Sequence, residues 1–133
     1  MSHHTQMQVK MKEPASIQSA LVDIGIAEKA IEFHQNPVPV LNYYRKDEGR
    51  RGHIVVRKGA DLSPGRHLSA DMGFLCGDQP QACIDDMDTS KIDQGRLQGR
   101  YAYHATYGAA RLKGYGVTEA DQGEEIHLTI TIP

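Results

Sequence analysis

The chain has 133 residues, the length of one domain, and its 15 basic and 17 acidic side chains give a formal charge of −2. This near balance argues against a dedicated nucleic-acid-binding protein, because such proteins carry a basic excess. No apolar run approaches the roughly 20 residues that cross a bilayer, no secretory signal is evident, and two cysteines are too few for a disulfide framework. We therefore expect a single cytoplasmic domain over residues 1–133, without a membrane anchor.

The first half of the chain predicts a strand, a helix and a strand pair. Residues 5–11 alternate in polarity, as in a half-buried strand. Pro14 and the apolar spacing that follows predict a short amphipathic helix over residues 14–24, which Gly25 ends. Residues 26–37 fit either a continued helix or an irregular strand. The β-branched and aromatic stretches 38–44 and 53–58 then predict an antiparallel pair across a polar turn.

The second half predicts two short strands, a long helix and a final hairpin. Residues 70–77 and 81–88 read as strands joined by a turn. Residues 92–113 read as a helix that Gly114 ends in a left-handed conformation, and alternation then continues to the C-terminus. One face of this helix carries Leu97, Tyr101, His104, Ala105, Gly108 and Leu112.

Two amphipathic helices beside an antiparallel sheet define a fold class. They predict an α+β protein, a two-layer sandwich with a mostly antiparallel sheet and both helices on one face. The opposite face of such a sheet is available to solvent or to a partner.

Several segments also carry a family resemblance: the opening MSHHTQMQVKMKEPASIQSALVDIG, NYYRKDEGRRGHIVVRK (42–58), ADMGF (70–74), QGRYAYHATYGAARLKGYGV (98–117) and DQGEEIHLTI (121–130). They resemble the family named for hypothetical chloroplast reading frame 35, small proteins of cyanobacteria, algal plastids, other bacteria and some phages. The resemblance implies no established activity. Because bacterial members often look like companions of an AAA-type ATPase, it implies an adaptor role with a protein partner.

A tyrosine-histidine cluster is the first candidate site. Tyr101, His104 and Tyr107 fall within two turns of one predicted helix, and with Tyr44 they would line a pocket between helices and sheet. His104 would then serve as a general base or a ligand contact. The plainer interpretation, which a lone histidine favours, is that these rings pack the helix on the sheet with their polar tips at the rim.

A basic stretch is the second candidate. It contains Arg45, Arg50, Arg51 and Arg57, together with two lysines, and would dock an anion or a protein partner. The alternative is a solvated loop and strand rim, which is the more frequent origin of a charge run.

An acidic group and the two thiols complete the candidates. Asp71, Asp78, Asp85, Asp86 and Asp88 surround one predicted hairpin, but their spacing differs from that of a calcium loop and favours a solvated hairpin end. Cys76, Cys83, His53 and His67 are the side chains that a zinc site would use. The cysteine spacing favours two buried thiols that act as small apolar groups. We expect no metal, no cofactor and no assigned catalytic residue.

These observations favour a non-enzymatic binding or adaptor module that acts with a protein partner, and they leave room for self-association into a homo-oligomer. The alternative is a small-ligand binder or enzyme with the Tyr/His-lined pocket. A small inhibitor protein from a mobile element also fits the size of the chain.

Overall fold

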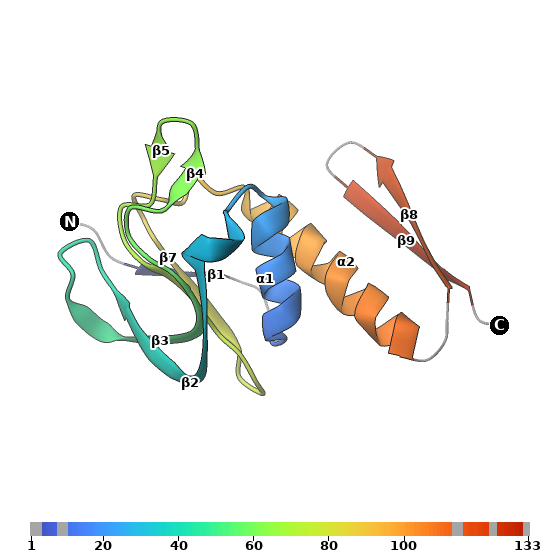
Figure 1. Cartoon of the computed structure of the whole chain (residues 1–133), viewed down its shortest axis with the longest axis horizontal. Coiled ribbons are helices and arrows are strands. Elements are labelled where there is room, and N and C mark those ends of the chain that lie inside the picture. The colour runs from blue at the N-terminus through green and yellow to red at the C-terminus, as the bar shows by residue number, and fades with distance from the viewer. Residues whose placement is uncertain (1–3, 8–10, 113–115, 123–124, 132–133) are drawn as a thin grey trace.

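The computed structural model describes residues 4–7, 11–112, 116–122 and 125–131. Figure 1 shows a curved sheet, two helices beside it and a separate terminal hairpin. The elements are β1 (His4–Met7), α1 (Pro14–Asp23), the short 3₁₀ helix η1 (Glu28–Ala30), β2 (Ile31–Leu41), β3 (Asp47–Val56), β4 (Asp61–Ser63), β5 (Arg66–His67), β6 (Met72–Leu75), β7 (Gln81–Asp85), α2 (Gln94–Leu112), β8 (Gly116–Gln122) and β9 (Glu125–Thr131).

The main sheet has five strands in the order β1-β7-β6-β3-β2, and all its strand pairs are antiparallel. The strand pairs β4–β5 and β8–β9 form two small hairpins of their own. The α+β class and the mostly antiparallel sheet are therefore confirmed.

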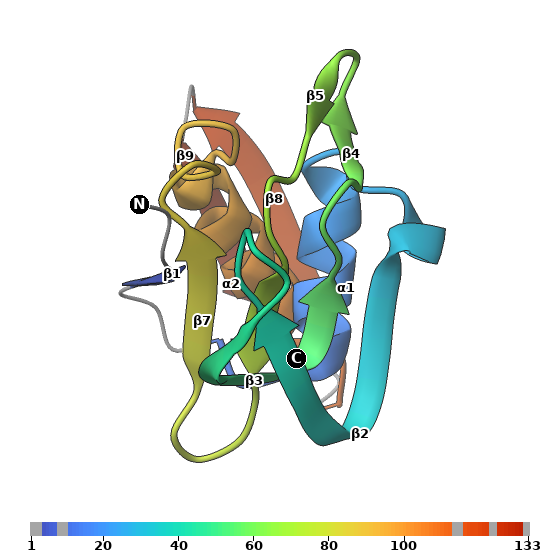
Figure 2. The same cartoon turned by 90° about the vertical axis from the view of Figure 1, so that its left-hand side faces the viewer.

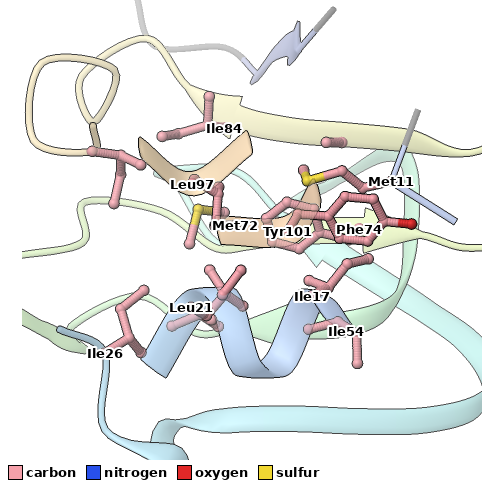
Figure 3. Packing of buried hydrophobic residues seen from close by; sticks show 14 of the residues in the cluster. Met11, Ile17, Leu21, Ile26, Ile54, Met72, Phe74, Ile84, Leu97 and Tyr101 are labelled. Carbon is pink, nitrogen blue, oxygen red and sulfur yellow. The ribbon is translucent and has the colours of Figure 1, made fainter. Parts of the chain in front are cut away.

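Both helices pack against the same face of this sheet. Ile17 and Leu21 of α1 and Leu97 of α2 join one buried cluster with Phe74 from the sheet, as Figure 3 shows. The Tyr101 ring of α2 lies in the same cluster. Its hydroxyl accepts hydrogen bonds from the N–H groups of Lys12 and Glu13, at 3.0 and 3.2 Å, just before α1 begins.

The boundaries of α1 follow from local sequence. Pro14 occupies the first turn, where a missing N–H costs nothing. Gly25 has a φ of 109° and donates its N–H to the Val22 carbonyl. The Ile26 N–H then bonds to the Leu21 carbonyl, which completes the glycine cap that the sequence predicts.

The strand β2 is longer than the expected strand over residues 38–44. It begins at Ile31, takes in most of the ambiguous segment and continues through Pro37 and Pro39. The register shifts between Phe33 and Val38, where residues 34–37 stand against residue 53 alone. Prolines are tolerated because β2 lies at an edge of the sheet and has no neighbour there that needs their N–H groups.

Other boundaries differ by a few residues. β7 ends at Asp85, and the next residues form a turn rather than the strand expected up to residue 88. β8 and β9 agree with the predicted terminal hairpin. The expected cap at Gly114 lies outside the described residues.

The sheet face opposite the helices is partly closed by the protein itself. The hairpin of β2 and β3 bends, and Val40 joins Val55 and Cys83 in a second buried cluster. Gly73 makes this possible, because a Cβ at that position would overlap the methyl groups of Val40. At these residues the face is therefore unavailable to a partner.

Candidate functional site

The turn that joins β2 and β3 is exposed, and several hydrogen bonds hold its backbone in place. We call residues 42–46 the β2–β3 tip. The Asn42 Oδ1 atom accepts hydrogen bonds from the N–H groups of Tyr44 and Lys46, both at 3.0 Å. The Asn42 N–H donates to the Lys46 carbonyl, and Arg45 takes a φ of 63°, which closes the turn.

A buried carboxylate fastens this tip to the sheet. Asp71 is fully buried, and its Oδ1 atom accepts from Arg45 Nη1 at 2.7 Å while its Oδ2 atom accepts from Arg57 Nη1 at 2.8 Å. The backbone N–H groups of Leu41 and Lys58 donate to the same carboxylate, at 2.9 and 2.8 Å. Burial raises the pKa of Asp71, but these hydrogen bonds outweigh it and the net pKa is lowered.

Two tyrosines project from the tip. Tyr44 is 58% exposed and Tyr43 is 37% exposed. Their rings meet edge to face with centroids 5.1 Å apart. Lys58 Nζ lies 4.2 Å from the Tyr43 ring centroid and also donates to the Tyr43 carbonyl at 2.9 Å. The result is an exposed aromatic pair on a turn whose backbone is held by hydrogen bonds to the side chains of Asn42 and Lys58.

The structure places Arg45 and Arg57 at this tip, and Arg50 and Arg51 within β3. Arg45 and Arg57 are brought together on Asp71, and Arg57 also pairs with Glu32 at 3.2 Å. Arg51 pairs with Asp47 at 2.8 Å. Arg50 is partly buried in β3. Much of the positive charge is therefore balanced within the protein.

Sequence reasoning missed Asn42 and Tyr43, which build and display the tip. An asparagine before a polar turn was an available signal, since its side chain commonly bonds to the backbone two residues later. Asp71 was considered only as a cation ligand or a solvated group.

The tyrosine-histidine cluster is only partly assembled. His104 Nε2 lies 2.6 Å from Asp23 Oδ2 on α1, and Arg100 Nε donates to the same oxygen at 2.8 Å. Burial raises the pKa of Asp23, but the bonds to His104 and Arg100 outweigh it and lower the pKa overall. The Tyr101 hydroxyl is already bonded near α1, and Tyr44 belongs to the distant tip.

Two open grooves meet at His104. One, of about 440 Å³, lies beside α1 and is lined by Ser19, Val22, Asp23 and Ile31, among others. The other, of about 600 Å³, includes Ser19, Tyr107 and Gly108. Tyr101 and Tyr44 line neither groove. Of the four predicted ligand-binding residues, His104 and Tyr107 are the two that line the same groove.

The acidic residues are mostly structural. Asp85 and Asp88 are fully buried, so the expectation of a solvated hairpin end is wrong for them and for Asp71. Asp88 accepts the N–H groups of Ser69 and Ala70 and pairs with Lys91 at 3.0 Å, because the loop needs a buried acceptor there. Within the described ranges, no three His, Cys, Asp or Glu side chains gather as metal ligands.

Both cysteines are free thiols. Cys83 is buried and Cys76 partly so, and burial raises the pKa of each to about 11. His53 Nδ1 accepts the Cys76 N–H at 2.9 Å, which uses that nitrogen in the fold.

No protein-family model, curated protein or solved structure matches this chain. The resemblance to the chloroplast reading frame 35 family therefore stays a prediction, and function has to be argued from the geometry above. Among the helices that the structure describes, none has the length and apolar character to cross a membrane.

Proposed function

We propose that this chain is a non-enzymatic binding module that docks a protein partner through the β2–β3 tip. The observation that carries the proposal is Tyr44, exposed beside Tyr43 on a turn that Asn42 and Asp71 hold in place. Tyrosine and arginine are the side chains most enriched where binding energy concentrates at protein interfaces.

The fixed backbone conformation of the tip supports this binding role. Tyr44 contributes its backbone N–H to the turn, so its ring is not needed to form the turn. The Tyr44 ring meets the Tyr43 ring edge to face but is 58% exposed, and this exposed surface is available for a partner. Because the backbone is already fixed in the free protein, little conformational entropy remains to be lost on binding.

The charge around the tip indicates the kind of partner. Lys58 lies over the Tyr43 ring, and Arg45 and Lys46 follow the two tyrosines directly in the chain. Arg45 is paired with Asp71, Arg51 is paired with Asp47, and Glu48 accepts a hydrogen bond from Asn42. A partner surface with carboxylates around a pocket for an aromatic ring would complement this arrangement. The family resemblance suggests an AAA-type ATPase as that partner, and two free cysteines fit a reducing, cytoplasmic location.

The first prediction concerns Tyr44. Tyr44→Ala should weaken partner binding on the order of thirtyfold, as loss of a hot-spot side chain does, and leave the melting temperature unchanged. The untagged chain would be purified from its host at low salt, and the affinity for a co-purifying ATPase measured by calorimetry. Met87→Ala, which truncates another exposed apolar side chain, is the matched control.

Two results would contradict the proposal that a partner binds through the β2–β3 tip. One is equal affinity of the Tyr44→Ala variant and the wild-type chain for the same partner. The other is recovery of the chain alone at every salt concentration tried.

A second candidate function is supported by the link between His104 and Asp23. A short carboxylate–histidine contact at the meeting point of two grooves is an arrangement that binds small polar ligands or moves a proton. Ser19 lines both grooves and would add a hydroxyl group.

The second prediction tests that candidate. In a thermal-shift screen of small carboxylates, phosphates and nucleotides, a compound that binds there should raise the melting temperature of the wild-type chain but not of His104→Ala. His67→Ala, which removes an exposed histidine paired with Asp61, should retain the shift. A shift that survives in His104→Ala, or a screen without any shift, would remove the case for these grooves.

A further inference from the structure

The β2–β3 hairpin bends where its strand pairing is interrupted. Regular pairing of the two strands runs as far as Phe33 and resumes at Val38. In between, residues 34–37 stand against residue 53 alone. Figure 2 shows β2 (cyan to teal) turning sharply along its length, which lays its second half over the sheet. We call residues 38–52 the flap, which carries the β2–β3 tip.

Arg57 spans this interruption. It follows the last residue of β3, and its Nε atom donates to both carboxylate oxygens of Glu32, at 3.2 Å each, on the regular side of the hairpin. Its Nη1 atom donates to the Pro39 carbonyl at 2.9 Å and to Asp71 Oδ2 at 2.8 Å. Pro39 belongs to the flap, and Asp71 also accepts the N–H of Leu41, another flap residue. One guanidinium group therefore joins the two sides of the bend.

The charges around Arg57 keep its side chain in place. Burial lowers the pKa of Arg57, but its bonds to Asp71 and Glu32 outweigh this and raise the pKa overall. Burial raises the pKa of Glu32, but its bonds to His34 and Arg57 outweigh this and lower the pKa overall. Arg57 is thus held by a carboxylate at each end, Glu32 on one side of the bend and Asp71 on the other.

We propose that Glu32 is a positioning residue for the flap, and that it acts through Arg57. We call Glu32, Arg57 and Asp71 the latch. With Glu32 in place, the Arg57 Nε atom is engaged and Nη1 is directed at Pro39 and Asp71. Without this carboxylate, the long Arg57 side chain regains rotamers in which Nη1 leaves the flap. The flap then opens more often.

The latch bears on binding because the tip lies on the flap. A partner meets Tyr44 in the orientation that the closed flap provides, and this consequence rests on the proposed function. The latch itself is tested on the free chain, without any partner. Its failure and the failure of the proposed docking site are therefore distinguishable.

The third prediction is measured by amide hydrogen exchange of the free chain, followed by NMR. Leu41, whose N–H donates to Asp71, should be less protected than Ile84 in β7, because the flap opens while the main sheet stays paired. Glu32→Gln should raise the exchange rate of Leu41 about threefold, the effect of losing a partly exposed ion pair. Arg57→Gln should raise it on the order of tenfold or more.

A double substitution tests whether Glu32 acts through Arg57. The variant that combines Glu32→Gln with Arg57→Gln should exchange at Leu41 no faster than Arg57→Gln alone, since the carboxylate then has nothing to position. His34→Ala removes the contact of Glu32 with His34 and should match the wild-type chain. Arg57→Lys keeps the charge but not the forked geometry, and it takes the place of Arg57→Gln if that variant does not fold.

Three results would each overturn the latch. The first is equal protection of Leu41 and Ile84 in the wild-type chain, which would mean that the flap does not open on its own. The second is an unchanged exchange rate of Leu41 in Glu32→Gln. The third is a double variant in which the two effects multiply, which would show that Glu32 acts independently of Arg57.

Discussion

Replacement of Asp71 by asparagine should lower the free energy of unfolding by about 3 kcal/mol, near the lower end of the cost of breaking a buried ion pair. The variant removes the charge that holds Arg45 and Arg57 and weakens the acceptor for the Leu41 and Lys58 N–H groups. The cost stays at the lower end because both arginines are partly exposed and can be rehydrated. Urea denaturation would measure it.

Exposed Asp78 provides the matched control for this prediction. Asp78→Asn should change the free energy of unfolding by no more than about 0.5 kcal/mol, as surface substitutions usually do. Equal stabilities of the Asp71→Asn and Asp78→Asn variants would show that the carboxylate does not fasten the tip.

The pH dependence of stability offers an independent check on the same carboxylate. The pKa of Asp71 is lowered from its ordinary value of 3.8, so its contribution to stability is present above that value and is lost as the pH falls through the folded pKa. Asp23 and Glu32 also have lowered pKa values and add to the same acid sensitivity. The stability of Asp71→Asn should fall less steeply below pH 3.8 than that of the wild-type chain.

Substitution of Gly73 should have the second large effect. A Cβ at Gly73 would overlap the methyl groups of Val40, which packs directly over the β6 backbone. Gly73→Ala should therefore lower the free energy of unfolding by about 1–3 kcal/mol, the usual cost of overpacking a core. The measurement is again urea denaturation.

Two comparisons isolate the cause. Val40→Ala in the Gly73→Ala background should recover part of the loss, since the added methyl group then has room. Gly108→Ala adds the same methyl group on α2, where it would meet no atom within 4 Å from the described residues outside the adjoining helix backbone, and should raise stability by up to about 1 kcal/mol. A Gly73→Ala variant as stable as the wild-type chain would contradict the proposed packing of Val40.

The helices could be predicted from the sequence because their signals are local. The apolar spacing that ends at Gly25 and the periodicity around Leu97 and Tyr101 each specify a helix within a few turns. The course of β2 was harder to predict. Whether Pro37 ends a strand depends on whether that strand lies at an edge, and only the order of the whole sheet decides this.

The candidate site could be predicted only in part, because its contacts join distant segments. The basic stretch was found, but Asp71 is 26 residues from Arg45 and nothing local indicates that the two meet. His104 was singled out, yet its partner Asp23 is 81 residues away on another helix. Carboxylates that satisfy buried N–H groups also look the same in a sequence as solvated ones, which explains the misinterpretation of Asp88.

Cys83, on the sheet face that the β2–β3 hairpin covers, can report on the opening of that hairpin. Cys83 lies in one buried cluster with Val40, and burial raises the pKa of its thiol to about 11, so at neutral pH it is protonated and shielded. An alkylating reagent can reach it when the bent hairpin lifts from the sheet, and the alkylation rate therefore reports that opening. Peptide mapping separates this signal from that of Cys76, so the motion can be followed without an introduced label.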